Sequence, residues 1–291
     1  MIELTDKALL NFNKIGLIPG PNETPDFFAK RAEYCLHLKD NLSDELKACL
    51  DAEASAQSDT LNSATHSLAK DYDISPAWVP LFYSNYRLPF WHGGCAWIYQ
   101  LTEETPTAAL IQLRSHFRKS PRYLGIYEQQ ELLTHELCHI GRMAFQEEKY
   151  EEVLAYGTSS SRFRRWLGPL VQSSIESVIF LLVIFMLVVF DVFLITMNHS
   201  DAYMMALWLK IIPVTLVVIA LYRLWKRQKT FKKTVSNLTE IVGEQANAVI
   251  YRLTDKEISS FAKMSTQQIK EYAATQPTDD LRWQVIKKAY F

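Results

Sequence analysis

Two long apolar runs dominate the hydropathy pattern of this 291-residue chain. The first covers residues 175–197 and the second covers residues 202–225, with only a short polar turn between them. Each run is long enough to cross the hydrocarbon core of a bilayer as a helix. Helices in soluble cores have fewer contiguous apolar residues. The pattern therefore predicts a two-helix transmembrane hairpin within residues 162–228 and makes the lipid bilayer a partner of the chain.

Basic residues flank the open ends of this predicted hairpin. They are Arg162, Arg164 and Arg165 before the first run and Arg223, Lys226, Arg227, Lys229, Lys232 and Lys233 at the end of the second. The turn at the tip contains no Lys or Arg. Because positively charged flanks stay in the cytoplasm, we expect an integral, two-pass membrane protein with both termini cytoplasmic.

One acidic and one basic residue interrupt the apolar runs. Asp191 lies near the end of the first run and Lys210 near the start of the second, so their depths in the membrane nearly match. Charged side chains at such depth need a partner or a polar cavity. We expect an ion pair between them; the alternative is that Lys210 reaches the interface and Asp191 is protonated.

The region before the membrane, residues 1–161, combines helical and β-like patterns. Helical periodicity begins at Thr24, an N-cap followed by proline, and continues to about residue 70. Alternating apolar runs then predict a β hairpin, and two helices follow it. The expected strands are 95–101 and 108–114, and the expected helices are about 126–145 and 149–156.

The region after the membrane, residues 229–291, has only helical signals. Two segments have the spacing of a capping box, one starting at Thr254 and one at Ser265, and residues 279–291 form an amphipathic pattern. The fold class we expect is α+β and mostly helical: a soluble domain with a small sheet, a transmembrane hairpin and a helical C-terminal cytoplasmic region.

Composition changes this picture little. The 31 basic and 32 acidic residues nearly balance, which gives no indication of nucleic-acid binding. The four cysteines are far apart, so we expect no disulfide framework and a reducing compartment. The N-terminal residues do not have the pattern of a cleavable signal peptide.

The strongest chemical pattern is ELLTHELCHIGRMAF, residues 131–145. On a helix His135 and His139 project from one face, one turn apart, so both imidazoles can bind one metal ion. Glu136 lies beside them and can take a proton from a metal-activated water. Polar residues flank the motif, which places it outside the bilayer core and close to the cytoplasmic membrane surface.

This motif resembles the HExxH zincins, and within them the gluzincins, whose third protein ligand is a glutamate on a downstream helix. The resemblance covers residues 95–156. Glu152 and Ala155 are similar to the ExxA pattern of gluzincin ligand helices, and Phe145 stands where metzincins have a third histidine. The resemblance implies a Zn²⁺ ion held by His135, His139 and Glu152. The alternative third ligands, in decreasing order of preference, are Glu151, Glu147 and Glu148, and finally His116.

Three further features of the site are expectations. The chain has Tyr156 where gluzincins often have an aspartate, so the residue that supports the first histidine is unassigned. Candidate donors for oxyanion stabilisation are Tyr156, Tyr150 and His116. Either predicted strand, 95–101 or 108–114, could hold an extended substrate at a sheet edge.

The function we expect is that of a membrane-anchored zinc metallopeptidase, an endopeptidase that cleaves protein or peptide substrates near the membrane with Glu136 as general base. The alternative is a membrane scaffold or regulatory protein with a structural, non-catalytic metal site. A channel or transporter subunit is a weaker interpretation, because two spans alone provide little pathway.

Overall fold

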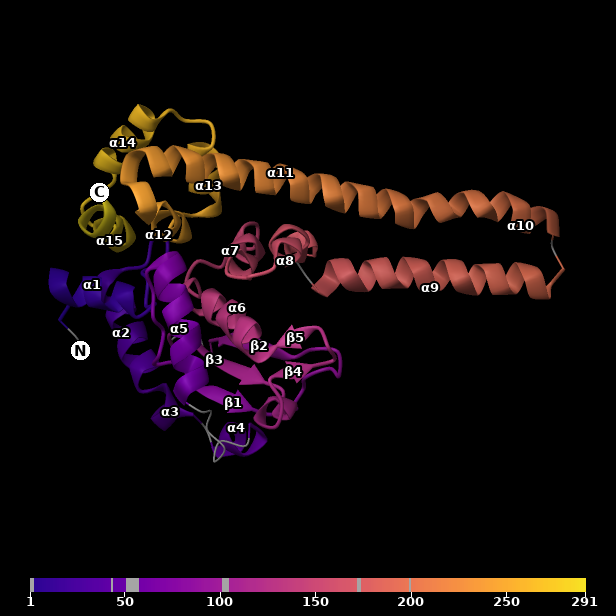
Figure 1. Cartoon of the computed structure of the whole chain (residues 1–291), viewed down its shortest axis with the longest axis horizontal. Helices are drawn as coiled ribbons and strands as arrows, with labels where there is room; N and C mark the ends of the chain where they lie inside the picture. The colour runs from indigo at the N-terminus through magenta and orange to yellow at the C-terminus, as the bar shows by residue number, and fades with distance from the viewer. Residues whose placement is uncertain (1–2, 43, 51–57, 101–104, 172–173, 199) are drawn as a thin grey trace.

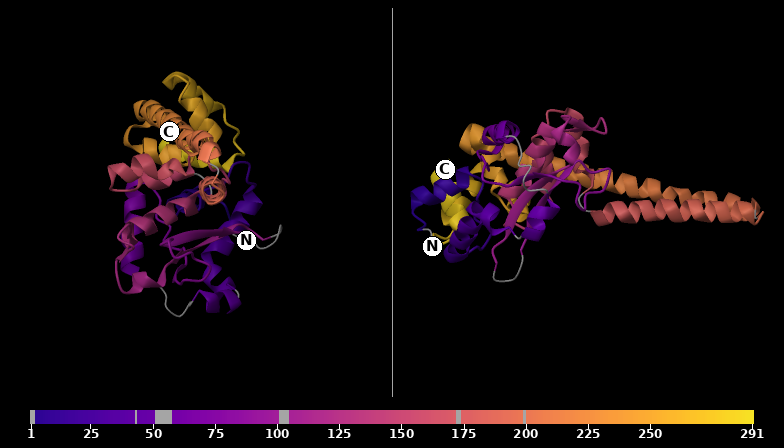
Figure 2. Two further views of the ribbon diagram at one scale, coloured as in Figure 1. Left: turned by 90° about the vertical axis from the view of Figure 1, so that its right-hand side faces the viewer. Right: turned by 90° about the horizontal axis from the view of Figure 1, so that it is seen from below.

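The computed structural model describes residues 3–42, 44–50, 58–100, 105–171, 174–198 and 200–291. A mostly helical body with a small sheet lies at one end, and two long helices extend from it as a rod (Figure 1). Both termini lie in the body, and the rod keeps its direction in the perpendicular views (Figure 2). At this level the expected fold class is confirmed: the described chain is mostly helical, with a small sheet and two helices of membrane length.

The first part of the body is helical, as the sequence predicts. Thr24 caps the second helix by accepting a hydrogen bond from the Phe27 amide, and Pro25 occupies the first helical position. The helices here are α1 (Asp6–Lys14), α2 (Pro25–Leu36), α3 (Leu38–Asn41), α4 (Asp44–Cys49) and α5 (Ser58–Tyr72).

A three-stranded sheet follows, with strand order β1-β3-β2. The predicted hairpin is present as the antiparallel pair β2 (Gly94–Tyr99) and β3 (Ala108–Leu113), and β1 (Leu81–Tyr83) adds a parallel strand to β3. Every residue of β3 is buried, whereas β2 lies at an edge of the sheet. A short hairpin, β4 (Arg122–Tyr123) and β5 (Tyr127–Glu128), comes after the 3-10 helix η1 (Ser115–Arg118).

The two helices expected before the membrane are α6 (Gln129–Gly141) and α7 (Glu151–Gly157). The first begins three residues later than predicted, because Tyr127 and Glu128 belong to β5. The chain turns between the two helices, where Gln146 has a positive φ of 52°. The segment then continues through α8 (Arg162–Leu167) and η2 (Gly168–Leu170) toward the rod.

The rod consists of α9 (Ser174–Thr196) and a returning helical segment that starts with α10 (Ser200–Ala206) and η3 (Leu207–Lys210) and continues as α11 (Ile211–Val242). Both are long and apolar enough to cross a membrane. Ion pairs join them near both ends: Lys210 Nζ lies 2.9 Å from Asp191 Oδ2, and Arg223 Nη1 lies 2.9 Å from Glu176 Oε1. The expected contact between Asp191 and Lys210 is therefore present.

The second helix does not end with its apolar run. It continues as α11 into the body and leads through η4 (Gly243–Gln245) to α12 (Ala246–Tyr251), α13 (Asp255–Phe261), α14 (Thr266–Thr275) and α15 (Leu281–Tyr290). Both predicted capping boxes are present, at Thr254 with Glu257 and at Ser265 with Gln268.

The regions before and after the rod share one hydrophobic core, which runs from α1 to α15. At its centre Tyr251 of α12 stacks on Tyr72 of α5 with 4.7 Å between ring centroids, and its hydroxyl donates to the Cys138 carbonyl of α6. Gly141 permits this contact, because a Cβ there would lie 2.3 Å from the Tyr251 hydroxyl. The segment after the rod therefore packs directly against the helix that carries the HExxH motif.

Candidate metal centre

The two histidines of the motif face each other on α6. Their Nε2 atoms are 3.3 Å apart, and both rings are about one-sixth exposed. The opposite face of the helix is anchored in the core, where Leu133, Leu137 and Ile140 are fully buried. The four-residue spacing therefore places two ligand nitrogens at one point on the helix surface, as the sequence predicts.

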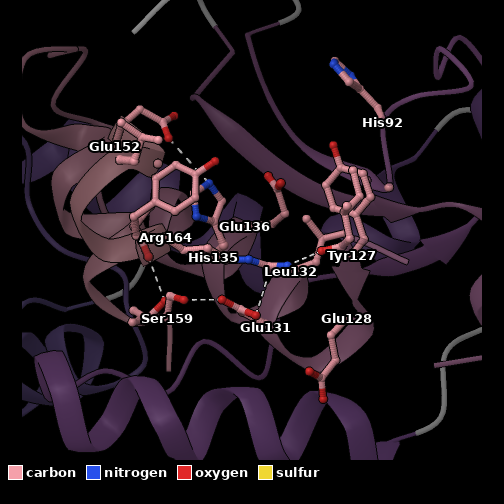
Figure 3. A pocket seen from close by; sticks show the side chains of 18 of the residues that line it. His92, Tyr127, Glu128, Glu131, Leu132, His135, Glu136, Glu152, Ser159 and Arg164 are labelled. Carbon is pink, nitrogen blue, oxygen red and sulfur yellow. Dashed lines mark hydrogen bonds and ion pairs between the residues drawn. The ribbon is translucent and has the colours of Figure 1, made fainter. Parts of the chain in front are cut away.

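Helix α7 brings Glu152 to the same point. Its carboxylate oxygens lie 3.6 Å from Nε2 of His135 and 3.7 Å from Nε2 of His139 (Figure 3). Each of these three residues offers one ligand atom, and all three atoms lie within 4.8 Å of one another. The turn between α6 and α7 thus brings Glu152 close to His139, 13 residues earlier in the chain. Together with His135 they form a group that could hold a metal ion.

The spacing of these atoms fits the chemistry of zinc. In a tetrahedral site with zinc–ligand distances of about 2.0–2.2 Å, neighbouring ligand atoms are separated by about 3.3–3.6 Å. The two histidine nitrogens, 3.3 Å apart, fall in that range, and each lies 3.6–3.7 Å from a different oxygen of the Glu152 carboxylate. Two imidazole nitrogens and one carboxylate oxygen are also a common ligand set of catalytic zinc sites.

Glu151 has a different position from its neighbour Glu152. Its Oε1 lies 3.1 Å from Nδ1 of His139, and its Oε2 accepts a 2.8 Å hydrogen bond from Nε of the buried Arg142. Arg142 in turn donates to the main-chain carbonyls of Tyr251 and Leu253, after the rod. A hydrogen bond from Nδ1 of His139 to Glu151 leaves the lone pair of Nε2 directed at the candidate metal position.

Glu136 is hydrogen-bonded to the edge strand β2. The amide of Ala96 in β2 donates a 2.8 Å hydrogen bond to Oε2 of Glu136. Burial raises the pKa of Glu136, and the charge of His139 and the bond from Ala96 offset this only in part. A carboxylate with a raised pKa is a stronger base, which suits it to accept a proton near neutral pH.

Burial and charge separate the pKa values of the two histidines. Burial, together with the charge of His139, lowers the pKa of His135 to about 3. Burial also acts to lower the pKa of His139, but the bond to Glu151 and the charges of Glu151, Glu152 and Glu136 outweigh it and raise the pKa to about 9. The three carboxylates thus stabilise positive charge at this position, whether that charge is a proton or a metal ion.

A cavity of about 550 Å³ opens beside these residues. His135, Glu136 and Glu152 form part of its wall, together with residues of the β4–β5 hairpin and of α8 (Figure 3). Tyr156 also lines it and packs edge-on against His135, with 4.5 Å between ring centroids. Burial and the charge of Glu152 raise the pKa of Tyr156 to about 12, so its hydroxyl keeps its proton and can donate it in hydrogen bonds.

The other candidates from the sequence lie elsewhere. His116 is exposed on η1, and Tyr150 is buried with its hydroxyl 3.2 Å from Ser259 Oγ. Glu147 accepts a hydrogen bond from the Asp255 amide, and Glu148 is exposed; neither lines the cavity. Of the three proposed oxyanion donors, only Tyr156 reaches the cavity wall.

Sequence reasoning gave no role in the site to several polar residues of the cavity wall. Among them are His92, before β2, Tyr127 on β5 and Arg164 on α8. It also treated Glu151 only as a substitute metal ligand. The consecutive glutamates at the start of a helix could have indicated two different carboxylate roles, because neighbouring helical side chains point about 100° apart.

Comparisons of the chain with protein-family models, with curated proteins and with solved structures found no match. The function is therefore argued from the site alone.

Proposed function

We propose that this chain is a membrane-anchored zinc metallopeptidase that hydrolyses peptide bonds with Glu136 as general base. The observation that carries the proposal is the meeting of three candidate metal ligands beside the Glu136 carboxylate, with His135, Glu136 and Glu152 in the wall of one open cavity. Structural zinc sites are usually closed by four protein ligands, whereas catalytic sites have three and leave a position open. Among the residues that the structure describes, the group has three, which favours catalysis over a purely structural role.

In this proposal His135, His139 and Glu152 hold the zinc ion. Zinc, when bound, lowers the pKa of water and polarises a substrate carbonyl. Glu136 accepts the proton of the attacking water and passes it to the departing amine. The bond from Ala96 fixes the orientation of the Glu136 carboxylate, and its raised pKa brings it closer to the working pH. The Tyr156 hydroxyl donates to the oxyanion that develops on the substrate.

The edge strand β2 provides a place for an extended peptide. The Ala96 amide points away from β3 and toward Glu136, so the free edge of β2 runs beside the site. A substrate strand could add to this edge through main-chain hydrogen bonds, which are independent of sequence. Strand β3 is excluded from this role because it lies between β1 and β2. Protein and peptide substrates are thus the class that the site accommodates.

The anchoring part of the proposal rests on the rod. Its two antiparallel helices return the chain to the body, so the regions before and after them lie on one side of the membrane that they cross. The basic flanks favour the cytoplasm for that side, and with it for both termini and the site.

Replacement of one carboxylate tests the proposed reaction. Glu136→Gln preserves the shape of the side chain and removes the base. We expect full zinc content and a loss of turnover of about 10²–10⁴-fold on a quenched fluorescent peptide. Glu148→Gln, an exposed change outside the cavity, is the matched control. Unchanged turnover in zinc-loaded Glu136→Gln would exclude Glu136 as the base, and absence of turnover in zinc-loaded wild type would favour the alternative, a scaffold or regulator with a structural metal.

A further inference from the structure

Exposed apolar side chains gather around the mouth of the cavity. We define this membrane-side rim as six residues, each 46–68% exposed: Phe90, Trp91, Leu124, Ile126, Phe163 and Trp166. Ile126 and Phe163 belong also to the cavity wall, so the rim borders the entrance. A group of exposed apolar side chains of this kind indicates a partner rather than water.

Hydrogen bonds join the three segments of the rim into one unit. The Tyr123 hydroxyl donates to the Phe90 carbonyl at 2.5 Å, which ties the loop before β2 to β4. Arg164 of α8 donates to the Ile126 carbonyl and, at 2.7 Å, to Glu131. Rim residues far apart in sequence are therefore held in fixed positions around the entrance.

The rim lies at the end of the body from which the rod extends. The tip of the β4–β5 hairpin reaches the level at which α9 begins, and α8 lies beside that start (Figure 1, Figure 2). Helix α8 is also fixed to α11, because Gln228 donates to the carbonyls of Arg165 and Trp166. A bilayer spanned by α9 and α11 would therefore have its surface at the rim.

The hairpin tip supports a bilayer as the occupant. Leu124 and Gly125 both have positive φ, 52° and 71°, at the centre of a turn closed by the bond from the Ile126 amide to the Tyr123 carbonyl, and turns with two positive φ values favour Asn-Gly. A leucine with positive φ is strained, and exposure of its apolar side chain to water does not offset that strain. Insertion into the apolar part of an interface would stabilise it, and the tryptophans and phenylalanines of the rim are typical of membrane interfaces.

We propose that this rim inserts into the membrane surface, so that the cavity receives substrate from the bilayer rather than from solution. The substrate class would be membrane-proximal, extended segments of membrane-bound proteins. This inference rests on the proposed peptidase function and on the rod as the membrane anchor.

A depth measurement tests the insertion without any turnover. A nitroxide label is attached at Leu124→Cys in the full chain, with Cys49 and Cys95 replaced by serine, and the protein is placed in phosphatidylcholine–phosphatidylglycerol nanodiscs. The label should collide more with oxygen than with a water-soluble nickel chelate. The control label at Leu36→Cys, at the end of α2, should show the reverse. A water-like label at 124 would overturn the proposal, as would dipolar broadening that shows a second copy on the rim.

A turnover ratio tests the delivery of substrate. One quenched peptide is offered either free or attached to a lipid of the same nanodisc. Leu124→Asn is a substitution that the turn accommodates. It should lower the ratio of anchored to free turnover about tenfold, because the free energy of burying one leucine side chain corresponds to a factor of about ten or more. An unchanged ratio would contradict the proposal. Absence of all turnover in zinc-loaded wild type would contradict the peptidase function instead, and the depth measurement would be unaffected.

Discussion

Nδ1 of His139 lies 3.1 Å from Oε1 of Glu151, the residue directly before the candidate ligand Glu152. One turn of α7 therefore supplies two carboxylates with separate positions: Glu152 lies near the candidate ligand nitrogens, and Glu151 lies beside Nδ1 of His139. Arg142 fixes Glu151 from a fully buried position. Arg142 also donates to main-chain carbonyls after the rod. The Glu151–Arg142 pair therefore links the orientation of His139 to the helices that follow the rod.

The first prediction separates the two glutamates. Glu151→Ala should weaken zinc binding by about 10–100-fold, because it frees the His139 ring, and Glu152→Ala should weaken it more, because it removes a ligand. Titration with a competing chelator measures both affinities, with Glu148→Ala as the exposed control. If Glu151→Ala is the more damaging change, the third ligand is Glu151.

The second prediction concerns the ion pair between Asp191 and Lys210 in the rod. Asp191→Lys and Lys210→Asp should each lower the unfolding temperature in detergent, because each leaves two like charges side by side on apolar helices. The double exchange restores opposite charges and should recover most of the loss. Strictly additive effects of the single changes would show that the contact contributes nothing.

The third prediction concerns topology. Reporter fusions at the C-terminus and before α1 should both report the cytoplasm, because the basic flanks of the rod lie on that side. A reporter inserted after Asn198, at the tip of the rod, should report the opposite side. The reverse pattern would place the cavity outside the cytoplasm.

The fourth prediction follows from the buried carboxylate of Glu257. Burial acts to raise its pKa, but Arg282, the Thr254 amide and the Trp283 indole outweigh this and hold the pKa below its usual 4.5. A lowered folded-state pKa stabilises the protein above the unfolded-state value, and this stability is lost as the pH falls through the folded-state value. We therefore expect the unfolding temperature to drop below about pH 4.5, the ordinary pKa of a glutamate.

Variants check the role of this pair. At pH 7, Glu257→Gln should lower the free energy of unfolding by about 3–5 kcal/mol, because it leaves the buried Arg282 with only the more distant carboxylate of Asp280, 3.9 Å away. The acid-induced loss of stability should also become smaller in this variant. Glu240→Gln, an exposed change on α11, should alter neither quantity. An equal acid dependence in Glu257→Gln and wild type would assign that dependence to other groups.

The local parts of this fold follow from sequence. Apolar length predicts the two rod helices, hydroxyl–carboxyl spacing predicts the capping box at Thr254, and histidine spacing predicts the pair on α6. These signals succeed because each arises within a few residues of chain. The motif also restricts where the third ligand can come from, since α7 is the next helix.

The long-range parts do not follow from sequence. The contact of Arg142 with the Tyr251 carbonyl spans 109 residues, and no local pattern encodes it. The same holds for β1, whose three residues pair in parallel with β3 residues distant in the sequence, Leu81 with Ile111 for example. The role of Glu151 and the position of the rim likewise depend on packing between distant segments.

The central claim is that this chain is a zinc-dependent peptidase, and the most direct test is removal and return of the metal. Purified protein should contain about one zinc per chain, lose hydrolysis of a quenched peptide when a chelator removes the zinc, and regain it when zinc is restored. Zinc-loaded Glu136→Gln should remain inactive in the same assay. Hydrolysis that persists in metal-free protein, or a wild-type chain that binds no zinc, would contradict the account.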